Sequence, residues 1–239
     1  MTRTGAPTPT LATGVVTETL WRASAPIFDA IMEHPFLAGL TAGTLELDRF
    51  SYYIAQDSHY LRDYARALST LAGRAPDAAA TAMFSRHAAN ALLVEQSMHS
   101  GILDELGLSG GSGGSGGSAL PPMSPTTLAY TSYLLATVHG RPYAEGLAAV
   151  LPCYWIYAEV GTRLLRQSSP NPLYARWIAT YGGEEFAAVV GEVLALTDRV
   201  AAEVPGVVRE TMQRHYLTSA RYEWMFWDAA YRREGWPVG

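Results

Sequence analysis

The sequence predicts an all-α protein, a single-domain bundle of helices, on three observations. Apolar residues recur with a period near 3.6 in almost every segment, and proline or glycine stands near the segment ends. Convincing signals of β-hairpins are absent. Apolar residues make up 49% of the 239 residues, and charged residues 16%, which suits a sizeable core. We expect one domain over residues 1–239, with an N-terminal tail over 1–13 and no internal repeats.

The first half of the chain predicts three helices. Residues 15–33 carry an apolar stripe, contain Pro26, which predicts a kink or a restart, and end at His34-Pro35. The second helix covers 45–71, and the third opens at Pro76-Asp77 and ends at about residue 106. Residues 109–120 are Gly/Ser-rich and predict a flexible loop, compatible with a native segment or an engineered replacement.

The helical pattern resumes unchanged after this loop, so the loop is not a domain boundary. Ser124-Pro125 reads as a cap and first turn for a helix that ends near residue 138. The stretch 143–167 contains Pro152, which predicts a kink or break. Asn171-Pro172 begins a short helix to Tyr181, followed by helices over 184–203 and from Pro205 to about residue 235.

Charge and cysteine content exclude several classes of protein. A net charge of -5 with a pI near 5.7 argues against nucleic acid as the main partner. One cysteine cannot form an internal disulfide. The N-terminus lacks the basic start and apolar run of a signal peptide, and no apolar run is long enough to span a membrane. We therefore expect a cytoplasmic protein with no membrane partner.

Cys153, the single cysteine, is the first candidate for chemistry. Pro152 fits the first turn of a helix, which would place Cys153 near a helix start, where the dipole favours a thiolate. Tyr157 is four residues further on and shares the face. The alternative is that Cys153 is a small buried hydrophobe, as most free cysteines are.

Asp57 is the second candidate, because it lies on the apolar stripe of a helix. It shares that face with Tyr60, Leu61 and Tyr64, and a buried aspartate is costly unless it is paired or used. The alternative is an ion pair with an arginine, for which Arg62 and Arg66 are close in sequence.

Glu223 is the third candidate, since aromatic residues surround it in the sequence. It shares a helix face with Phe226 and Trp227, and burial there would raise its pKa, as a general acid near neutral pH requires. Alternatively, Glu223 faces solvent and pairs with Arg221 or Arg233.

A nucleophile, two carboxylates and several tyrosines suit covalent catalysis on a flat heteroaromatic ring. A metal site is a weaker hypothesis. Glu95 and His99 are four residues apart on one helix, but a di-iron bundle uses paired Glu-x-x-His motifs, and the chain has none. A phosphate-binding glycine motif is also absent.

Several separated motifs resemble the thiaminase II (TenA) family of all-helical proteins with a haem-oxygenase-like fold. The similarity extends from about Val16 to Tyr231. The motifs are Phe50…Tyr53-x-x-Gln56-Asp57-x-x-Tyr60-Leu61, Ser124-Pro125-Thr126…Tyr130, Leu151-Pro152-Cys153-x-Trp155-x-Tyr157…Gly161, Tyr181, and Glu223-x-x-Phe226-Trp227-x-x-Ala230-Tyr231. The Gly/Ser run before Pro121 departs from the ordinary helical connection of that family.

This resemblance implies roles for individual residues. It makes Cys153 the nucleophile, Tyr60 the residue that raises its reactivity, and Glu223 the acid/base at the ring nitrogen. The residues that would contact the substrate are Asp57 at the amino-pyrimidine, the tyrosines Tyr130, Tyr157 and Tyr181, and Phe226 as a stacking wall.

The implied reaction is hydrolysis at the methylene carbon of a 4-amino-2-methylpyrimidine, for thiamin salvage. The substrate would be 4-amino-5-aminomethyl-2-methylpyrimidine or thiamin, with no cofactor and no metal, and the family often forms homotetramers. Two alternatives stay open. One is another enzyme of this fold, a pyrroloquinoline-quinone synthase-like or iron-dependent oxidase, which would need a histidine-rich pocket. The other is a regulator or carrier that binds a thiamin precursor, with Cys153 inert.

Overall fold

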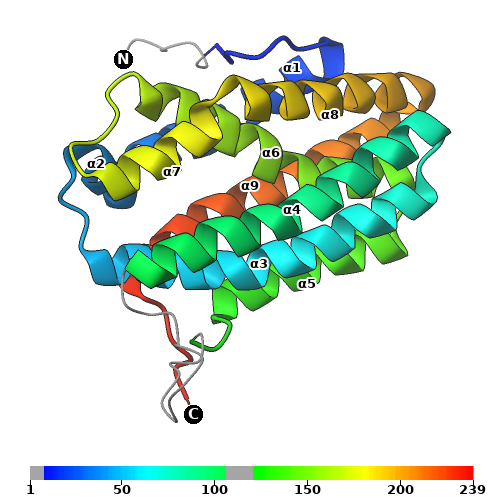
Figure 1. Ribbon diagram of the computed structural model, residues 1–239. Coiled ribbons are helices and arrows are strands. Elements are labelled where there is room, and N and C mark those ends of the chain that lie inside the picture. Colours follow the sequence, from blue (N-terminus) through cyan, green and yellow to red (C-terminus); the bar gives the residue numbers. More distant parts are fainter. Residues whose placement is uncertain (1–7, 106–120, 239) are drawn as a thin grey trace.

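The computed structural model describes residues 8–105 and 121–238, with the backbone alone over 94–105. The described residues contain helices and short connections but no strand, which confirms the all-α prediction. The predicted loop over 109–120 and residues 1–7 of the predicted tail lie outside this range. The helices (Figure 1) are α1 (Val15–Met32), α2 (Pro35–Ala42), α3 (Leu47–Arg74), α4 (Ala78–Glu105), α5 (Pro125–Gly140), α6 (Tyr143–Leu165), α7 (Pro172–Gly182), α8 (Glu184–Glu203) and α9 (Gly206–Arg232).

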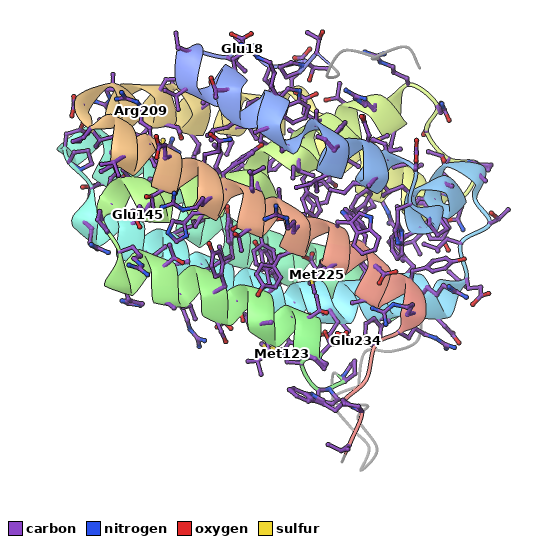
Figure 2. The ribbon with its side chains drawn as sticks, turned by 180° about the vertical axis from the view of Figure 1, so that it is seen from behind. Glu18, Met123, Glu145, Arg209, Met225 and Glu234 are labelled. Atoms are coloured by element: carbon purple, nitrogen blue, oxygen red, sulfur yellow. The ribbon has the colours of Figure 1, made fainter. Side chains whose placement is uncertain are left out.

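Helix α6 is the centre of the bundle, because residues on every face of it are buried. It contacts α3, α5, α7, α8 and α9. The α3–α4 pair lies on one side of the molecule and α7 and α8 lie on the other (Figure 1). From behind, α9 crosses the bundle between α1 and α5 (Figure 2). The central position of α6 brings its side chains within reach of most other helices.

The predicted break at Pro152 is wrong, since α6 continues through it from Tyr143 to Leu165. Proline removes one hydrogen bond inside a helix, but packing on all sides of α6 holds the backbone helical. The restart suggested at Pro26 is also not seen, and α1 continues through it. Pro26 is on the exposed face of α1, where solvent can satisfy the carbonyl that loses its partner.

Helix α2 was not predicted. His34 and Pro35 read as a stop signal for α1, yet they also start α2. The Nδ1 atom of His34 accepts a hydrogen bond from the amide of Phe36 at 3.2 Å, and Pro35 occupies the first turn. Gly43 then ends the helix with a φ of 70°, a conformation that favours glycine.

Among the described residues, none of the helices combines the length and apolar character needed to cross a membrane.

Candidate active site

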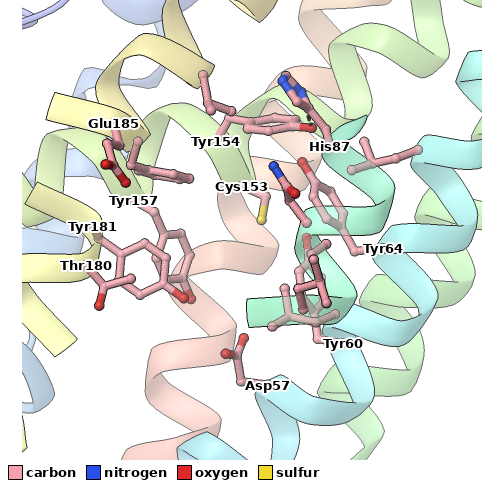
Figure 3. Close-up of a pocket in the computed structure, with 17 residues that line it drawn as sticks. Asp57, Tyr60, Tyr64, His87, Cys153, Tyr154, Tyr157, Thr180, Tyr181 and Glu185 are labelled. Atoms are coloured by element: carbon pink, nitrogen blue, oxygen red, sulfur yellow. Dashed lines mark hydrogen bonds between the residues drawn. The ribbon is translucent and has the colours of Figure 1, made fainter. Parts of the chain in front are cut away.

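A cavity of about 400 Å³ lies beside the middle of α6. Side chains of α3, α4, α6, α7 and α8 line it (Figure 3). Five of the sequence-predicted residues are among them: Asp57, Tyr60, Cys153, Tyr157 and Tyr181. The cavity therefore gathers residues that are more than a hundred positions apart in the chain.

One wall of the cavity comes from the stripe on α3 that contains Asp57. Asp57, Tyr60 and Tyr64 follow one another at helical spacing, and all three are buried. The predicted shared face is thus observed. Arg66, one of the two partners considered for Asp57, pairs with Asp63 at 2.5 Å on the exposed side of α3 instead.

Cys153 lies on the opposite wall, in the middle of α6. It is partly buried, because the cavity exposes its thiol. Burial raises the pKa of this thiol well above its ordinary value, and the carboxyl of Glu223 adds to the effect. The hydroxyls of Tyr60 and Tyr64 act in the opposite direction.

The prediction that a helix start favours a Cys153 thiolate is therefore wrong. Because α6 runs unbroken through Pro152, the first turn of α6 lies far from Cys153. In the free protein the group is a neutral thiol near neutral pH.

Glu223 is buried on α9, with 2% of its surface exposed, as its aromatic neighbours predicted. Burial raises its pKa to about 8, and a hydrogen bond donated by the Tyr130 hydroxyl at 2.6 Å opposes part of that rise. The alternative of a solvent-exposed ion pair is excluded by this burial. Arg233, one of its possible partners, pairs with Asp48 at 3.2 Å. Glu223 is thus mostly protonated at neutral pH.

Tyr130, Glu223 and Phe226 are not among the lining residues of this cavity. They pack behind Tyr60, whose ring centre lies 5.0 Å from that of Tyr130 and 5.7 Å from that of Phe226. On the other side, the rings of Tyr157 and Tyr181 are 5.0 Å apart. The structure therefore places the predicted residues around one aromatic centre, in two layers.

Other lining residues were not predicted from the sequence. His87 from α4, Tyr154 from α6 and Glu185 from α8 line the same cavity. The His87 Nδ1 atom lies 3.2 Å from the Tyr154 hydroxyl. No periodicity marks these residues, and only their proximity in space associates them with Cys153.

Among the described residues, no three His, Cys, Asp or Glu side chains lie close enough together to hold a metal ion. The described groups around the cavity therefore do not form a metal site. The Glu95–His99 candidate lies outside the described side chains.

An all-helical fold that surrounds a cysteine, two buried carboxyl groups and stacked tyrosines is typical of a protein that binds a small molecule. The chain belongs to the TENA/THI-4/PQQC family, whose model matches residues 21–233. It is 39% identical to the aminopyrimidine aminohydrolase of Bacillus subtilis over 214 residues, which cover 90% of this chain and 89% of that protein.

A second relative is the thiamine biosynthesis multifunctional protein ThiED of Corynebacterium efficiens. The identity is 40% over 234 residues, which cover 98% of this chain but only 30% of that longer protein. Among solved structures, a TenA homologue from P. horikoshii OT3 superimposes with a TM-score of 0.80 at 30% identity, covering 92% of this chain and 99% of that one.

Proposed function

We propose that this chain is an aminopyrimidine aminohydrolase (thiaminase II). It hydrolyses 4-amino-5-aminomethyl-2-methylpyrimidine, and also thiamin, to 4-amino-5-hydroxymethyl-2-methylpyrimidine. The observation that carries the proposal is the Cys153 thiol, which faces an aromatic cavity that also contains Asp57 and lies within electrostatic range of protonated Glu223. Relatives named aminopyrimidine aminohydrolase at 35–39% identity support the same reaction.

In the first step, the sulfur of Cys153 adds to a carbon of the pyrimidine ring, and a ring nitrogen takes up a proton. The ring gains its proton from Glu223, and the proton that the thiol loses returns to the Glu223 carboxylate, so the step is balanced in charge. Glu223 holds a proton below its pKa of about 8 and is the group we assign to protonate the ring nitrogen. The adduct then carries no net charge that the buried site would have to stabilise.

In the second step, the bond between the methylene carbon and its nitrogen breaks, and the electron pair leaves with the nitrogen. Water adds to the methylene carbon, and the bond to sulfur breaks to restore the aromatic ring and the Cys153 thiol. Tyr60 is placed to assist this exchange, since its hydroxyl lowers the pKa of the thiol.

Asp57 and the aromatic residues fix the position of the ring. The buried Asp57 carboxylate can accept hydrogen bonds from the amino group of the pyrimidine. Tyr157 and Tyr181 offer ring surfaces on one side, and Tyr130 and Phe226 support Tyr60 on the other. Apart from the substrate, this chemistry uses groups of the chain itself and one water molecule.

A second candidate is a protein that binds a thiamin precursor without turnover. The raised pKa of Cys153 favours it, because an inert thiol is expected of a binding protein. An oxidase of this family is less well supported, since His87 is the only histidine among the described residues that line the cavity.

The test is a product assay with 4-amino-5-aminomethyl-2-methylpyrimidine and thiamin, using wild type and Cys153→Ser. We expect hydroxymethylpyrimidine from wild type only, with folding and pyrimidine binding nearly intact in the variant. Tight binding without product from wild type would favour the binding protein. The homotetramer and the cytoplasmic location stay predictions, which size measurement in solution and fractionation of cells would test.

A further inference from the structure

The segment that leads into α5 is bonded to two other parts of the fold. The Gln56 side chain of α3 accepts a hydrogen bond from the amide of Ser124 at 2.9 Å and donates one to the carbonyl oxygen two residues earlier at 3.0 Å. Between these two bonds, the carbonyl oxygen of Met123 accepts a hydrogen bond from the indole of Trp236 at 3.0 Å. Trp236 belongs to the tail that follows α9 (residues 233–238), so this segment joins α3 to that tail.

Glu234 of the same tail completes the first turn of α5. The first amides of a helix have no carbonyl partner within the helix. Pro125 has no amide hydrogen, and the amide of Thr127 donates to the Ser124 hydroxyl at 3.2 Å. The amide of Thr126 donates to the Glu234 carboxyl at 2.9 Å. A side chain that lies more than a hundred residues away in the chain thus supplies one cap of this helix.

The Glu234 carboxyl has a defined position at the start of α5. Arg233 ends α9 in a left-handed conformation with a φ of 51°, and the amide of Glu234 donates to the carbonyl oxygen of Ala229 at 2.9 Å. The hydroxyl of Tyr52 on α3 donates to the carbonyl oxygen of Glu234. Figure 2 shows Met123 and Glu234 at the end of the bundle where α5 begins and α9 ends. Bonds on both sides of Glu234 therefore hold the end of α9 against α5.

The same two helices carry the hydrogen-bonded pair Tyr130 and Glu223. Tyr130 is one turn after Thr126 on α5, and both side chains are buried. Its hydroxyl donates the 2.6 Å hydrogen bond to Glu223, which lies on α9. Glu234 therefore links the start of the helix that carries Tyr130 to the end of the helix that carries Glu223.

We propose that Glu234 and Trp236 are positioning residues, which dock the start of α5 on the end of α9 and so hold the Tyr130 hydroxyl on the Glu223 carboxyl. They act through Tyr130, since neither is among the residues that line the cavity. The effect on turnover rests on the proposed function, whereas the effect on the Tyr130–Glu223 hydrogen bond does not.

Losing this dock should change the pKa of Glu223 in a defined direction. Burial raises that pKa, the Tyr130 hydrogen bond lowers it, and the Asp57 carboxyl raises it. The other titratable groups within electrostatic range are Tyr60, Cys153, Tyr157, Tyr181 and Tyr216. If the start of α5 is loosened, the hydrogen bond from Tyr130 weakens, and the pKa of Glu223 rises further. The alkaline fall in turnover should then move to higher pH.

The experiment compares Glu234→Ala with Glu234→Gln. Alanine removes the acceptor for the Thr126 amide, whereas glutamine keeps an oxygen that can accept the same bond. We expect the alkaline fall in kcat to move up by about 0.5 to 1 pH unit in Glu234→Ala, as partial loss of a hydrogen bond to a carboxylate predicts. In Glu234→Gln it should stay near that of wild type. Trp236→Phe, which keeps an aromatic ring but loses the indole N–H, should move it in the same direction as Glu234→Ala. Glu184→Ala, at an exposed position of α8, is the control and should not move it.

Combination with Tyr130→Phe separates positioning from general stabilisation. Tyr130→Phe removes the hydroxyl through which Glu234 acts, so Glu234→Ala should cause no further shift of the fall in that background. A role in stability alone would make both backgrounds easier to unfold without moving the fall in either. If Glu234→Ala does not fold, Trp236→Phe takes its place in both comparisons. No shift, or the same shift with and without the Tyr130 hydroxyl, would overturn the proposal.

Unfolding in urea tests the same hydrogen bond if wild type yields no product. The free energy of unfolding falls with pH while only the unfolded state has lost the Glu223 proton, and this fall ends near the folded pKa of about 8. In Glu234→Ala the fall should continue to higher pH than in wild type, and in Glu234→Gln it should not. That result would support the positioning role without the reaction. Falls that end at the same pH in all three proteins would refute it, whether or not turnover is seen.

Discussion

The buried carboxyl of Glu223 should make the stability of the fold depend on pH. Burial raises its pKa from the ordinary 4.5 to about 8 in the folded protein. Below pH 4.5 the carboxyl is protonated in both states and contributes nothing to this dependence. Between pH 4.5 and 8 only the unfolded state loses the proton, so the free energy of unfolding falls by about 1.4 kcal/mol per pH unit. Above pH 8 the accumulated loss is about 5 kcal/mol.

Substitution by glutamine isolates this contribution. Glu223→Gln removes the ionisation but keeps an oxygen that can accept the hydrogen bond of Tyr130. We expect the variant to gain stability relative to wild type as pH rises from 4.5 to 9, by about 5 kcal/mol in total. For a chain of this size the gain corresponds to roughly 10 to 20 °C in the midpoint of thermal unfolding.

The assay is urea unfolding of both proteins at pH 4.5, 7 and 9, with the slope checked for two-state behaviour. The comparison of the variant with wild type at pH 4.5 removes any effect of the amide itself. Glu184→Gln, which changes an exposed carboxyl on α8, is the control and should follow wild type at every pH. If Glu223→Gln and wild type lose stability in parallel between pH 4.5 and 9, the raised pKa of Glu223 is refuted.

Three further predictions concern activity and packing. Turnover by wild type should fall about tenfold per pH unit above pH 8, because Glu223 loses its proton there. Glu223→Gln should lose roughly 10²- to 10⁴-fold in kcat and should not show this fall. Initial rates from pH 6 to 10 measure both effects. Tyr130→Phe removes a hydrogen bond that lowers the pKa of Glu223, so the fall should move to higher pH, and a shift to lower pH would contradict this. In Gly161→Ala, the new methyl group would overlap the backbone of Tyr181. The free energy of unfolding should therefore fall by about 1 to 3 kcal/mol, and KM should rise. The control is Gly191→Ala, whose methyl group meets nothing within 4 Å and which should change neither quantity.

The helices could be predicted well because each is an independent local pattern. Ser124-Pro125 and Asn171-Pro172 begin α5 and α7 as predicted, and both cap side chains accept the expected amide hydrogen bonds. His34-Pro35 shows the limit of such patterns. The same two residues can end one helix and begin another, and only the packing of Phe36 and Leu37 in the core decides that α2 forms.

Part of the candidate site could be predicted because two acidic residues lie on otherwise apolar faces of their helices. Asp57 and Glu223 are acidic residues on apolar stripes, and burial is what such a conflict predicts. Tyr154, Glu185 and His87 show no conflict of this kind. They become neighbours only when α4, α6 and α8 pack together, and the spacing along one helix holds no information about that packing.

Cys153 shows how one wrongly predicted helix start changes the expected pKa of a side chain. Pro152 predicts a helix start, but the buried surroundings of α6 keep the helix continuous, so the thiol lacks the dipole that would stabilise a thiolate. Its pKa is raised, and iodoacetamide should therefore modify folded wild type slowly at pH 7 and about tenfold faster with each further pH unit, until the pH reaches the raised pKa. Protein unfolded in urea, whose thiol has an ordinary pKa near 8.5, is the control and should react faster at pH 7. Because the chain has one cysteine, the mass gain reports this site alone. Rapid modification of the folded protein at pH 7, with a plateau below pH 8, would show that Cys153 is a thiolate in the free protein. Slow modification means that Cys153 is a neutral thiol there, so its proton must leave as the sulfur adds to the pyrimidine ring.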